Sequence, residues 1–565
     1  MIAPGIDVAP GDPVAVAVAN GCIGLAWPGG STSIVTNDLS MLLVGICRGG
    51  PRFVWWSRET AARFAVYGAR PSSCWDLAAV HRLITGRSRD DPAAVWAAIR
   101  GLPEPAVVAA EPTLLDLDDT GDEPLDRDGQ LSVGWQRGGW AETPARTKRW
   151  AELALASYDV QRRALLELDD PRTDQRQPPL RLLTAHAESL AALLAVELER
   201  DGLPLDRAAM TELLAGIIGT RPVDDHHATA QRRARDDEVL RKFPAPPVDL
   251  RNPAQVRELL GRIGLDVPDT RSWRLEPHAA SLPPVAALLA WRKAERMATT
   301  YGWSWLDRHV GADGRLRGGW SPAEGAGRMA AGAGLHNLPA ELRSAVRADD
   351  GWVLVRADLG QVEPRVLAVV SGDTELAAAA RAEDMYAPVA AALGCDRPVA
   401  KVSVLAAMYG QTSGTAGAAL RDMDRAYPKA MAYLRDAEQA GRDGVDIRTY
   451  GGRLLRLHRE GDDQRFPPSA WGRFARNATV QGAAAELFKA WAGTVRAGLA
   501  SRVEDGRIVL CLHDELLLHV PAAEATAAVD LLKESLDATA HWWAAGSGVR
   551  FVVDVNVADR WAAAH

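Results

Sequence analysis

The pattern that most constrains the fold is a pair of apolar runs, residues 507–512 and 516–520, that flank the tripeptide His513-Asp514-Glu515. Short runs this rich in Val, Ile and Leu are typical of buried β-strands, and a polar turn between two of them predicts a hairpin. Such a hairpin must join a sheet, with Asp514 and Glu515 at its tip in front of a buried wall. Asp is common in hairpin turns for conformational reasons alone, so the tripeptide by itself indicates little about function.

A second apolar run, residues 353–357, is followed by Asp358 and predicts a further strand, with a helix beginning at Glu363. A carboxylate after a strand is often only a helix cap. Two carboxylates at strand ends are, however, also the arrangement that two-metal phosphoryl transfer needs. A further signal is required to choose between these interpretations.

A basic stripe supplies that signal. Arg397, Lys401, Leu405 and Tyr409 recur every four residues, so they share one broad face of a predicted helix that Gly410 ends. A merely solvated helix face would alternate Lys with Glu, but no acidic residue follows Arg397 in this helix. An unpaired Arg and Lys on one stripe imply an anionic partner such as a triphosphate.

Composition narrows the class of protein. The chain has 565 residues, too many for one core, and predicts two to four domains. Its net charge of −8 argues against a surface coated with nucleic acid but allows a basic cleft on an acidic body. Five cysteines without a CxxC pair predict reduced thiols in a cytosolic protein and no zinc site. We see no signal peptide and no apolar run of membrane-spanning length.

The order of strand-like and helix-like runs predicts an α/β and α+β multidomain protein. Such runs alternate over residues 1–105, which indicates a small α/β domain. Residues 106–146 are typical of an acidic linker that contains Pro and Gly. The chain is then strongly helical before the last third mixes strands and helices. The longer helices are expected at residues 180–202, 251–261, 282–302, 374–393, 397–409 and 472–499.

Three of these segments together resemble motifs of the family A DNA polymerases, the class of bacterial DNA polymerase I. The first palm motif of that family is similar to Asp358-Leu359-Gly360-Gln361-Val362-Glu363-Pro364-Arg365. The fingers helix is similar to Arg397-x3-Lys401-x3-Leu405-x3-Tyr409-Gly410, and the last palm motif to His513-Asp514-Glu515. Two further segments resemble parts that contact the primer–template, Gly327-Arg328 with Leu335-His336-Asn337-Leu338-Pro339, and Arg473-x3-Asn477-x3-Gln481-Gly482. The resemblance covers residues from about 180 to 565.

The resemblance implies a right-hand polymerase. Its parts would be an exonuclease-like domain at 1–105, the linker at 106–146, a helical connection and thumb at 147–317, the first part of the palm at 318–375, the fingers at 376–455, and the second part of the palm, with its antiparallel sheet, at 456–565. A 5′ nuclease domain has no room here. The chain therefore resembles the stand-alone bacterial branch labelled bifunctional 3′–5′ exonuclease/DNA polymerase.

The N-terminal domain departs from the family. A 3′–5′ exonuclease needs four acids for two metals, beginning with an Asp-x-Glu pair on the first strand. No Asp-x-Glu occurs in residues 1–105, and only Asp76 resembles one of the four. We therefore expect a degenerate exonuclease-like domain with little or no proofreading.

The resemblance also implies roles for the acids and the basic stripe. Asp358 and Asp514 would ligate two Mg²⁺ ions, for which Mn²⁺ can substitute, and Glu515 would be a supporting acid. Arg397 would grip the outer phosphates, and Lys401 would neutralise the α-phosphate region or protonate pyrophosphate.

Other residues would bind the two substrates. Tyr409 would stack near the nascent base pair and Glu363 would crowd the sugar 2′ position. The remaining dNTP-binding residues would be Gln361, Leu405 and Tyr386. Contacts to the primer–template would come from Arg328, Asn337, Arg473, Asn477, Gln481, His513, Arg292 and Lys293.

Several positions differ from the family pattern. Leu405 stands where Phe or Tyr is usual, Leu359-Gly360 replaces a Tyr-Ser pair, and Tyr386 replaces a phosphate-contacting His. Pro364 interrupts the usual Glu-Leu-Arg run, although Pro is tolerated in a first helical turn. None of these changes removes an expected metal ligand.

The function expected is template-directed DNA synthesis in repair or gap filling, by a monomer in the bacterial cytoplasm at the nucleoid, with no membrane partner. One alternative is a single-subunit RNA polymerase of the phage type, against which Glu363 argues as a 2′ gate. Another is a catalytically silent protein that binds primer–template. Two-metal hydrolysis lacks the additional acids.

Overall fold

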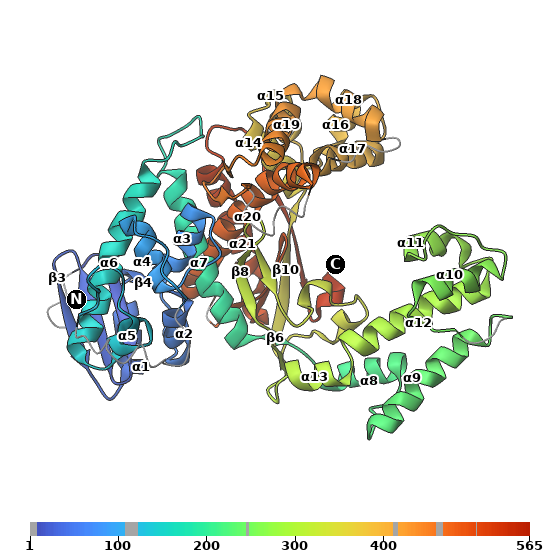
Figure 1. Cartoon of the computed structure of the whole chain (residues 1–565), viewed down its shortest axis with the longest axis horizontal. Helices are drawn as coiled ribbons and strands as arrows, with labels where there is room; N and C mark the ends of the chain where they lie inside the picture. Colours follow the sequence, from blue (N-terminus) through green and yellow to red (C-terminus); the bar gives the residue numbers. More distant parts are fainter. Residues whose placement is uncertain are drawn as a thin grey trace.

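The computed structural model describes residues 8–107, 123–244, 248–410, 416–458, 467–503 and 505–564. These form four parts, which we call the N-terminal unit, the central sheet, the helical lobe and the helical arm (Figure 1). The most acidic stretch of the predicted linker, residues 111–122, lies outside the described residues.

The N-terminal unit is built on a five-stranded sheet of order β3-β2-β1-β4-β5. The strands are β1 (Pro13–Ala19), β2 (Cys22–Trp27), β3 (Gly30–Val35), β4 (Arg52–Trp55) and β5 (Ser73–Asp76). Pairing is antiparallel from β1 to β3 and parallel from β1 through β4 to β5. The helices between them are α1 (Leu39–Cys47), α2 (Arg58–Val66), α3 (Leu77–Thr85) and α4 (Pro92–Arg100). This is the α/β pattern predicted for residues 1–105.

Successive residues of β1 are buried on opposite faces of this sheet. Val14, Val16 and Val18 pack with α1 and α2, whereas Ala15 and Ala17 pack with Trp150 of α6. α6 (Pro144–Leu166) crosses β2 so closely that a Cβ on Gly24 would collide with the backbone of Thr147. Most of α6 is predicted from the sequence to belong to the connection and thumb, but the helix completes the core of the N-terminal unit. The short α5 (Val133–Gln136) precedes it.

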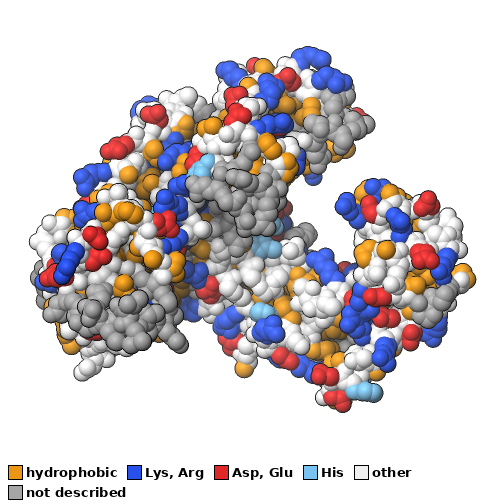
Figure 2. All heavy atoms as spheres, viewed as in Figure 1, with side chains coloured by type: hydrophobic (Ala, Val, Ile, Leu, Met, Phe, Trp, Pro, Cys, Tyr) orange, Lys and Arg blue, Asp and Glu red, His pale blue; other side chains and the backbone are white. Residues whose placement is uncertain are grey.

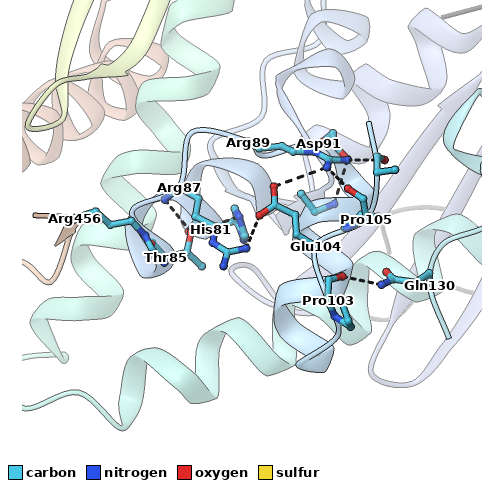
Figure 3. Close-up of polar contacts among 12 residues, drawn as sticks. His81, Thr85, Arg87, Arg89, Asp91, Pro103, Glu104, Pro105, Gln130 and Arg456 are labelled. Atoms are coloured by element: carbon cyan, nitrogen blue, oxygen red, sulfur yellow. Dashed lines mark hydrogen bonds and ion pairs between the residues drawn. The ribbon is translucent and has the colours of Figure 1, made fainter. Parts of the chain in front are cut away.

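Two contacts help to fasten the N-terminal unit to the rest of the chain. Figure 3 shows one of them, where Arg456 donates from Nε to the carbonyl oxygen of Thr85 at the end of α3 (2.7 Å). Arg456 follows the small ribbon of β11 (Ile447–Arg448) and β12 (Leu454–Leu455). At the other, α7 (Leu180–Asp201) packs against β5 and also against α20 (Pro468–Arg502). Buried ion pairs hold these two helices together, Glu188 with Lys489 (2.8 Å) and Glu197 with Arg496 (2.7 Å).

The central sheet is antiparallel, in the order β13-β14-β10-β15. Its strands are β10 (Trp352–Gly360), β13 (Arg507–Leu512), β14 (Glu515–Pro521) and β15 (Val552–Ala558). The predicted hairpin is confirmed as β13 and β14. β10 extends beyond the predicted end at residue 357, because Asp358 pairs with Glu515 on one side and Asp554 on the other. Asp358 therefore lies within a central strand.

Helices cover one face of this sheet. α21 (Ala525–Trp543) packs on β10, β14 and β15, and α20 packs beside α21 and on β13. The inward residues of β10, among them Val355, Ala357 and Leu359, belong to the largest core of the molecule. The alternate residues of the same strand, Arg356 and Asp358, therefore face the other side of the sheet.

The helical lobe comprises α14 (Val362–Ser371), α15 (Thr374–Ala379), α16 (Tyr386–Leu393), α17 (Arg397–Tyr409), α18 (Ala416–Ala426) and α19 (Pro428–Asp443). α17 has the predicted bounds. The single helix predicted at 374–393 is wrong, because the chain turns between α15 and α16. The buried guanidinium of Arg365 donates hydrogen bonds to the carbonyl oxygens of Ala380, Ala382 and Glu383. A continuous helix would need these carbonyl groups for its own backbone hydrogen bonds.

The helical arm consists of α8 (Arg207–Ile218), α9 (Asp225–Leu240), α10 (Pro253–Gly261), α11 (Ser272–Leu275), α12 (Pro283–Thr300) and α13 (Trp303–His309). Its outer part has a small core of its own around Val256, Leu260 and Leu288. Figure 2 shows that the surface is hollowed between the arm and the helical lobe. Three short ladders complete the strands, β6 (Leu203–Pro204) with β7 (Arg315–Leu316), β8 (Trp320–Glu324) with β9 (Arg328–Ala331), and the β11–β12 ribbon.

Two predictions from composition can be compared with the structure. All five cysteines are free thiols, as expected. Within the described ranges, no helix combines the length and apolarity needed to cross a membrane.

Candidate active site

A cavity of about 270 Å³ opens where the central sheet, the helical lobe and α20 meet. It brings together predicted site residues that are far apart in the sequence. They come from β9, the β10–α14 corner, α16, α17 and the β13–β14 turn, namely Arg328, Gln361, Glu363, Tyr386, Leu405, Tyr409, His513 and Asp514. Phe488 and Ala485 of α20 complete one wall.

Of the two predicted metal-binding acids, Asp358 lies on β10 and Asp514 lies in the β13–β14 turn, whose strand β14 pairs with β10. The turn that carries Asp514 is held against β10 by a hydrogen bond from the N–H of Leu359 to the carbonyl oxygen of Asp514 (3.0 Å). Burial, reinforced by the nearby charge of Asp358, raises the pKa of Asp514 to about 6. Burial also raises the pKa of Asp358, against the opposing effect of Arg356. The charge of Asp358 thus raises the pKa of Asp514, whereas the neighbouring acids that raise the pKa of Asp358 are Glu515 and Asp554.

The backbone at this site is locally strained. His513 in the turn and Gln361 at the start of α14 have positive φ values of 52° and 55°, which residues other than glycine rarely adopt. The Gln361 side chain links this corner to α16, since Nε2 donates to Asp384 (3.0 Å) and Oε1 accepts from the N–H of Met385 (2.9 Å). Gln361 is therefore occupied with shaping the corner.

Glu515 does not stand at the hairpin tip, as the sequence suggests. It is the first residue of β14, is 8% exposed and pairs with Asp358 across the sheet. Its carboxylate accepts from Nε of Arg356 and from Nε1 of Trp561, each at 2.8 Å. With both oxygens occupied, Glu515 supports the site from behind.

Arg356 is the site residue that the sequence analysis missed. It lies two positions before Asp358 on β10, and its Nη2 donates to Oδ2 of Asp358 (2.7 Å). The signal was present in the sequence, because a charged residue in an otherwise apolar run must share a face with Asp358 in a period of two. Its partner across the sheet depends on strand register, which the sequence does not reveal.

The basic stripe of α17 is only partly unpaired. Arg397 donates from Nη2 to Asp384 (3.2 Å) and also from Nε, and it lies over the ring of Tyr386. The inference that no acid neutralises Arg397 is therefore wrong, because Asp384 comes from the turn before α16. Lys401 is exposed, and no acidic partner is found for it in the part of the chain that the structure describes.

Glu363 is held from two sides. Its Oε1 accepts from Arg328 and its Oε2 accepts from the hydroxyl of Tyr409 (3.2 Å). The carboxylate therefore ties β9, α14 and α17 together on one wall of the cavity. Leu405, one helical turn before Tyr409, lines the same cavity.

The residues predicted to bind primer–template fall into two groups. Arg473 is exposed on α20, and Asn477 and Gln481 follow it at four-residue spacing and are partly exposed. Asn337 is also exposed. His513 packs edge-on against His336. In contrast, Arg292 donates to the carbonyl of Thr270 and Lys293 pairs with Glu341, so both are used within or beside the arm.

Asp76 has a different environment. It is 1% exposed, and it accepts from Nε1 of Trp55 (2.9 Å) and from the N–H of Ala79 (2.8 Å), which caps α3. Burial raises its pKa to about 6. Among the described residues, no three His, Cys, Asp or Glu side chains gather in a way that could hold a metal ion by themselves. Asp76 is therefore a buried helix cap whose two oxygens are both engaged.

Comparisons with known proteins identify the family of this chain. The family model described as DNA polymerase family A matches residues 247–563. DNA polymerase I of Chloroflexus aurantiacus is 27% identical over 440 residues, which cover 70% of this chain and 45% of the relative. The thermostable DNA polymerase I of Thermus aquaticus is 26% identical over 416 residues, 66% of this chain and 47% of the relative. The chain thus spans less than half the length of these relatives.

A solved structure shows the same fold. It is described as the POL domain of Pol1 from M. smegmatis in complex with DNA primer-template and dNTP. The two chains are 20% identical, with a TM-score of 0.66, and the match covers 99% of this chain and 97% of the other. The family match spans more than half of the 565 residues and includes both β10 and the β13–β14 hairpin. The chain therefore belongs to DNA polymerase family A.

Proposed function

We propose that this protein is a template-directed DNA polymerase that adds deoxynucleotides to a primer 3′ end by two-metal phosphoryl transfer. The observation that carries the proposal is that Asp358 on β10 lies next to the turn that bears Asp514, beside a cavity that α17 also lines. Relatives named DNA polymerase I, and a fold neighbour solved with primer-template and dNTP, support it. The bacterial relatives support a place on DNA in a bacterial cytoplasm.

The donor set suits magnesium. Mg²⁺ is usually held by one or two carboxylates and completes its shell with water and substrate phosphates, so a protein site of two acids is sufficient. The raised pKa of Asp514 reflects burial beside another carboxylate, a situation that a divalent cation relieves. Asp358 and Asp514 would hold the ions, which when bound would activate the primer hydroxyl and neutralise the leaving pyrophosphate.

The parts of the molecule correspond to a right hand. The central sheet with α20 and α21 would be the palm, split between residues 318–375 and 456–565. The helical lobe would be the fingers, within 376–455, and the arm would be the thumb. The hollow between lobe and arm is where primer–template would lie (Figure 2). Arg473, Asn477 and Gln481 of α20 would follow the minor groove, whose acceptor pattern depends little on sequence.

The incoming nucleotide would meet α17. Lys401 is available to the α-phosphate and could protonate the leaving group. Arg397 would exchange Asp384 for the outer phosphates, so its ion pair would break as the triphosphate binds. Glu363, fixed by Arg328 and Tyr409, would present a rigid wall to a 2′-hydroxyl.

The N-terminal unit would be a non-catalytic exonuclease-like domain. Asp76, the one acid that resembles an exonuclease ligand, is used as a helix cap and by an indole. We infer that the unit contributes to the fold through its contacts with α7 and through the hydrogen bond from Arg496 of α20 to the carbonyl oxygen of Pro71.

The test is primer extension by the purified full chain with Mg²⁺. We expect extension opposite each template base with dNTPs, at least 100-fold less with rNTPs, and none without a divalent cation. Equal use of rNTPs would favour an RNA polymerase. Binding of primer–template without extension in either Mg²⁺ or Mn²⁺ would favour the silent binding protein.

A further inference from the structure

Arg356 occupies an unusual position for a charged residue. It lies in the middle of the central strand β10 and is 9% exposed. Because side chains alternate along a strand, Arg356 and Asp358 lie on the same face, opposite the face that packs on the main core. Across the sheet, Asp358 is flanked by Glu515 on β14 and Asp554 on β15.

The guanidinium of Arg356 bridges two of these carboxylates. Nε donates to Oε2 of Glu515 at 2.8 Å, and Nη2 donates to Oδ2 of Asp358 at 2.7 Å. The other oxygen of Glu515 accepts from Trp561. Glu515 is thereby fully engaged, whereas Asp358, whose side chain is 33% exposed, has one oxygen engaged by Arg356.

A purely stabilising ion pair is the simpler explanation, but it accounts for only part of this arrangement. Buried ion pairs add little net stability, because desolvation offsets the attraction. Glu515 and Arg356 form such a pair by themselves. The other end of the guanidinium also binds the partly exposed Asp358, which is one of the two acids proposed to hold the metal ions.

We propose that Arg356 is a positioning residue of the metal site, which holds one oxygen of Asp358 and thereby weakens and restricts the binding of divalent cations there. This inference rests on the proposed function, since it takes Asp358 to be a metal ligand. With Oδ2 held by Arg356, Asp358 offers a cation its other oxygen only. The adjacent positive charge also repels the cation, and both effects raise the metal concentration that the site requires.

The restriction has a consequence for the choice of metal. Ca²⁺ takes six to eight oxygens and often uses both oxygens of a carboxylate, whereas Mg²⁺ and Mn²⁺ accept single oxygens in octahedral sites. Removing Arg356 should therefore tighten binding of Ca²⁺ more than that of Mn²⁺.

The experiment measures Mn²⁺ binding to the full chain by electron paramagnetic resonance, with Ca²⁺ as a competitor. Arg356→Met should tighten Mn²⁺ binding at least tenfold and make Ca²⁺ a better competitor. Arg315→Met is the matched control, because Arg315 also pairs with an aspartate, Asp349, away from the site. The control should bind Mn²⁺ as the wild type does. Extension assays should show a lower Mg²⁺ requirement for Arg356→Met.

Two further variants keep the test decisive. Arg356→Met with Glu515→Gln removes the buried pair as a unit and leaves no uncompensated buried carboxylate, so it serves if the single variant unfolds. It should show the same tightening. A folded variant that binds Mn²⁺ no more tightly than the wild type would overturn the inference. Loss of Mn²⁺ binding in Asp358→Asn tests the proposed function separately, and unchanged binding there would reject the metal site itself.

Discussion

Asp514, beside the central sheet, and Asp76, in the N-terminal unit, both have a raised pKa. Burial is the largest cause of the shift at both, and it raises each pKa to about 6. Their surroundings differ. Both oxygens of Asp76 accept hydrogen bonds inside a closed core. Asp514 lines an open cavity, and the second largest contribution to its pKa is another carboxylate, Asp358.

The comparison shows what a raised pKa can and cannot indicate. A buried acid at a helix start and a buried acid in an active site shift in the same direction, so the shift alone does not identify chemistry. A second carboxylate, an accessible cavity and a cation-bearing wall are what distinguish Asp514. These three features are the basis for expecting that the two acids respond differently to mutation.

The strongest test of the difference between Asp514 and Asp76 is to replace each aspartate with asparagine. Asp514→Asn should lower primer extension about 1,000-fold or more, since the developing charge would lose a metal ligand. Asp76→Asn should leave extension within about twofold of the wild type, because Asp76 is remote from the cavity lining. Single-turnover extension under saturating dNTP measures both.

Binding of primer–template serves as the control for these variants. Both should bind duplex with a recessed end within about threefold of the wild type in a fluorescence anisotropy titration. If Asp514→Asn lost DNA binding and extension together, Asp514 would be a structural acid like Asp76, and the distinction drawn between the two would fail.

The next largest effect concerns α17, which lines the same cavity as Asp514 and bears Lys401. Lys401→Ala should reduce kcat about 100-fold with a smaller change in DNA affinity, as expected for loss of a proton donor to the leaving group. Lys429→Ala, an exposed lysine on α19 of the same lobe, is the matched control and should behave as the wild type. An increase in KM alone, with kcat unchanged, would assign Lys401 to binding and not to chemistry.

The elements that frame Asp514 were largely predictable from sequence. The bounds of α17 follow from local periodicity and from Gly410, and the hairpin follows from two apolar runs around a polar turn. These signals depend only on residues that are close in the sequence, so they can be recognised without knowledge of the fold. The extension of β10 through Asp358 was not predictable in the same way, because it depends on pairing with two strands distant in sequence.

The partners of the charged residues were the least predictable. Asp384 neutralises Arg397 only because the chain breaks between α15 and α16, where Arg365 captures three carbonyl groups. The sequence pattern there favours one continuous helix. Similarly, α6 is recognisable as a helix, but its packing on the N-terminal sheet depends on a close approach at Gly24. Tertiary contacts decided each of these points.

A nuclease assay tests the interpretation of Asp76 as a helix cap and not a metal ligand. The full chain should degrade the 3′ end of single-stranded DNA no faster than background in Mg²⁺ or Mn²⁺, because both oxygens of Asp76 are engaged by Trp55 and Ala79 inside a closed core. Degradation is measured on an end-labelled oligonucleotide. Activity that is present in the wild type and absent from Asp76→Ala would make Asp76 a ligand and contradict the proposed loss of proofreading.

The smallest effect is a pH dependence confined to the N-terminal unit. The folded pKa of Asp76 lies near 6 and its ordinary value is 3.8, so the folded state favours the neutral acid. The stabilising contribution is present below pH 3.8 and is lost as the pH rises through 6, a difference of about 3 kcal/mol. Asp76→Asn cannot ionise and keeps an oxygen to cap α3. Hydrogen exchange of α3 amides should therefore show the variant gaining about 3 kcal/mol relative to the wild type between pH 4 and pH 8. Parallel pH profiles for the two proteins would mean that Asp76 is already charged in the folded state, and that only Asp514 has a raised pKa.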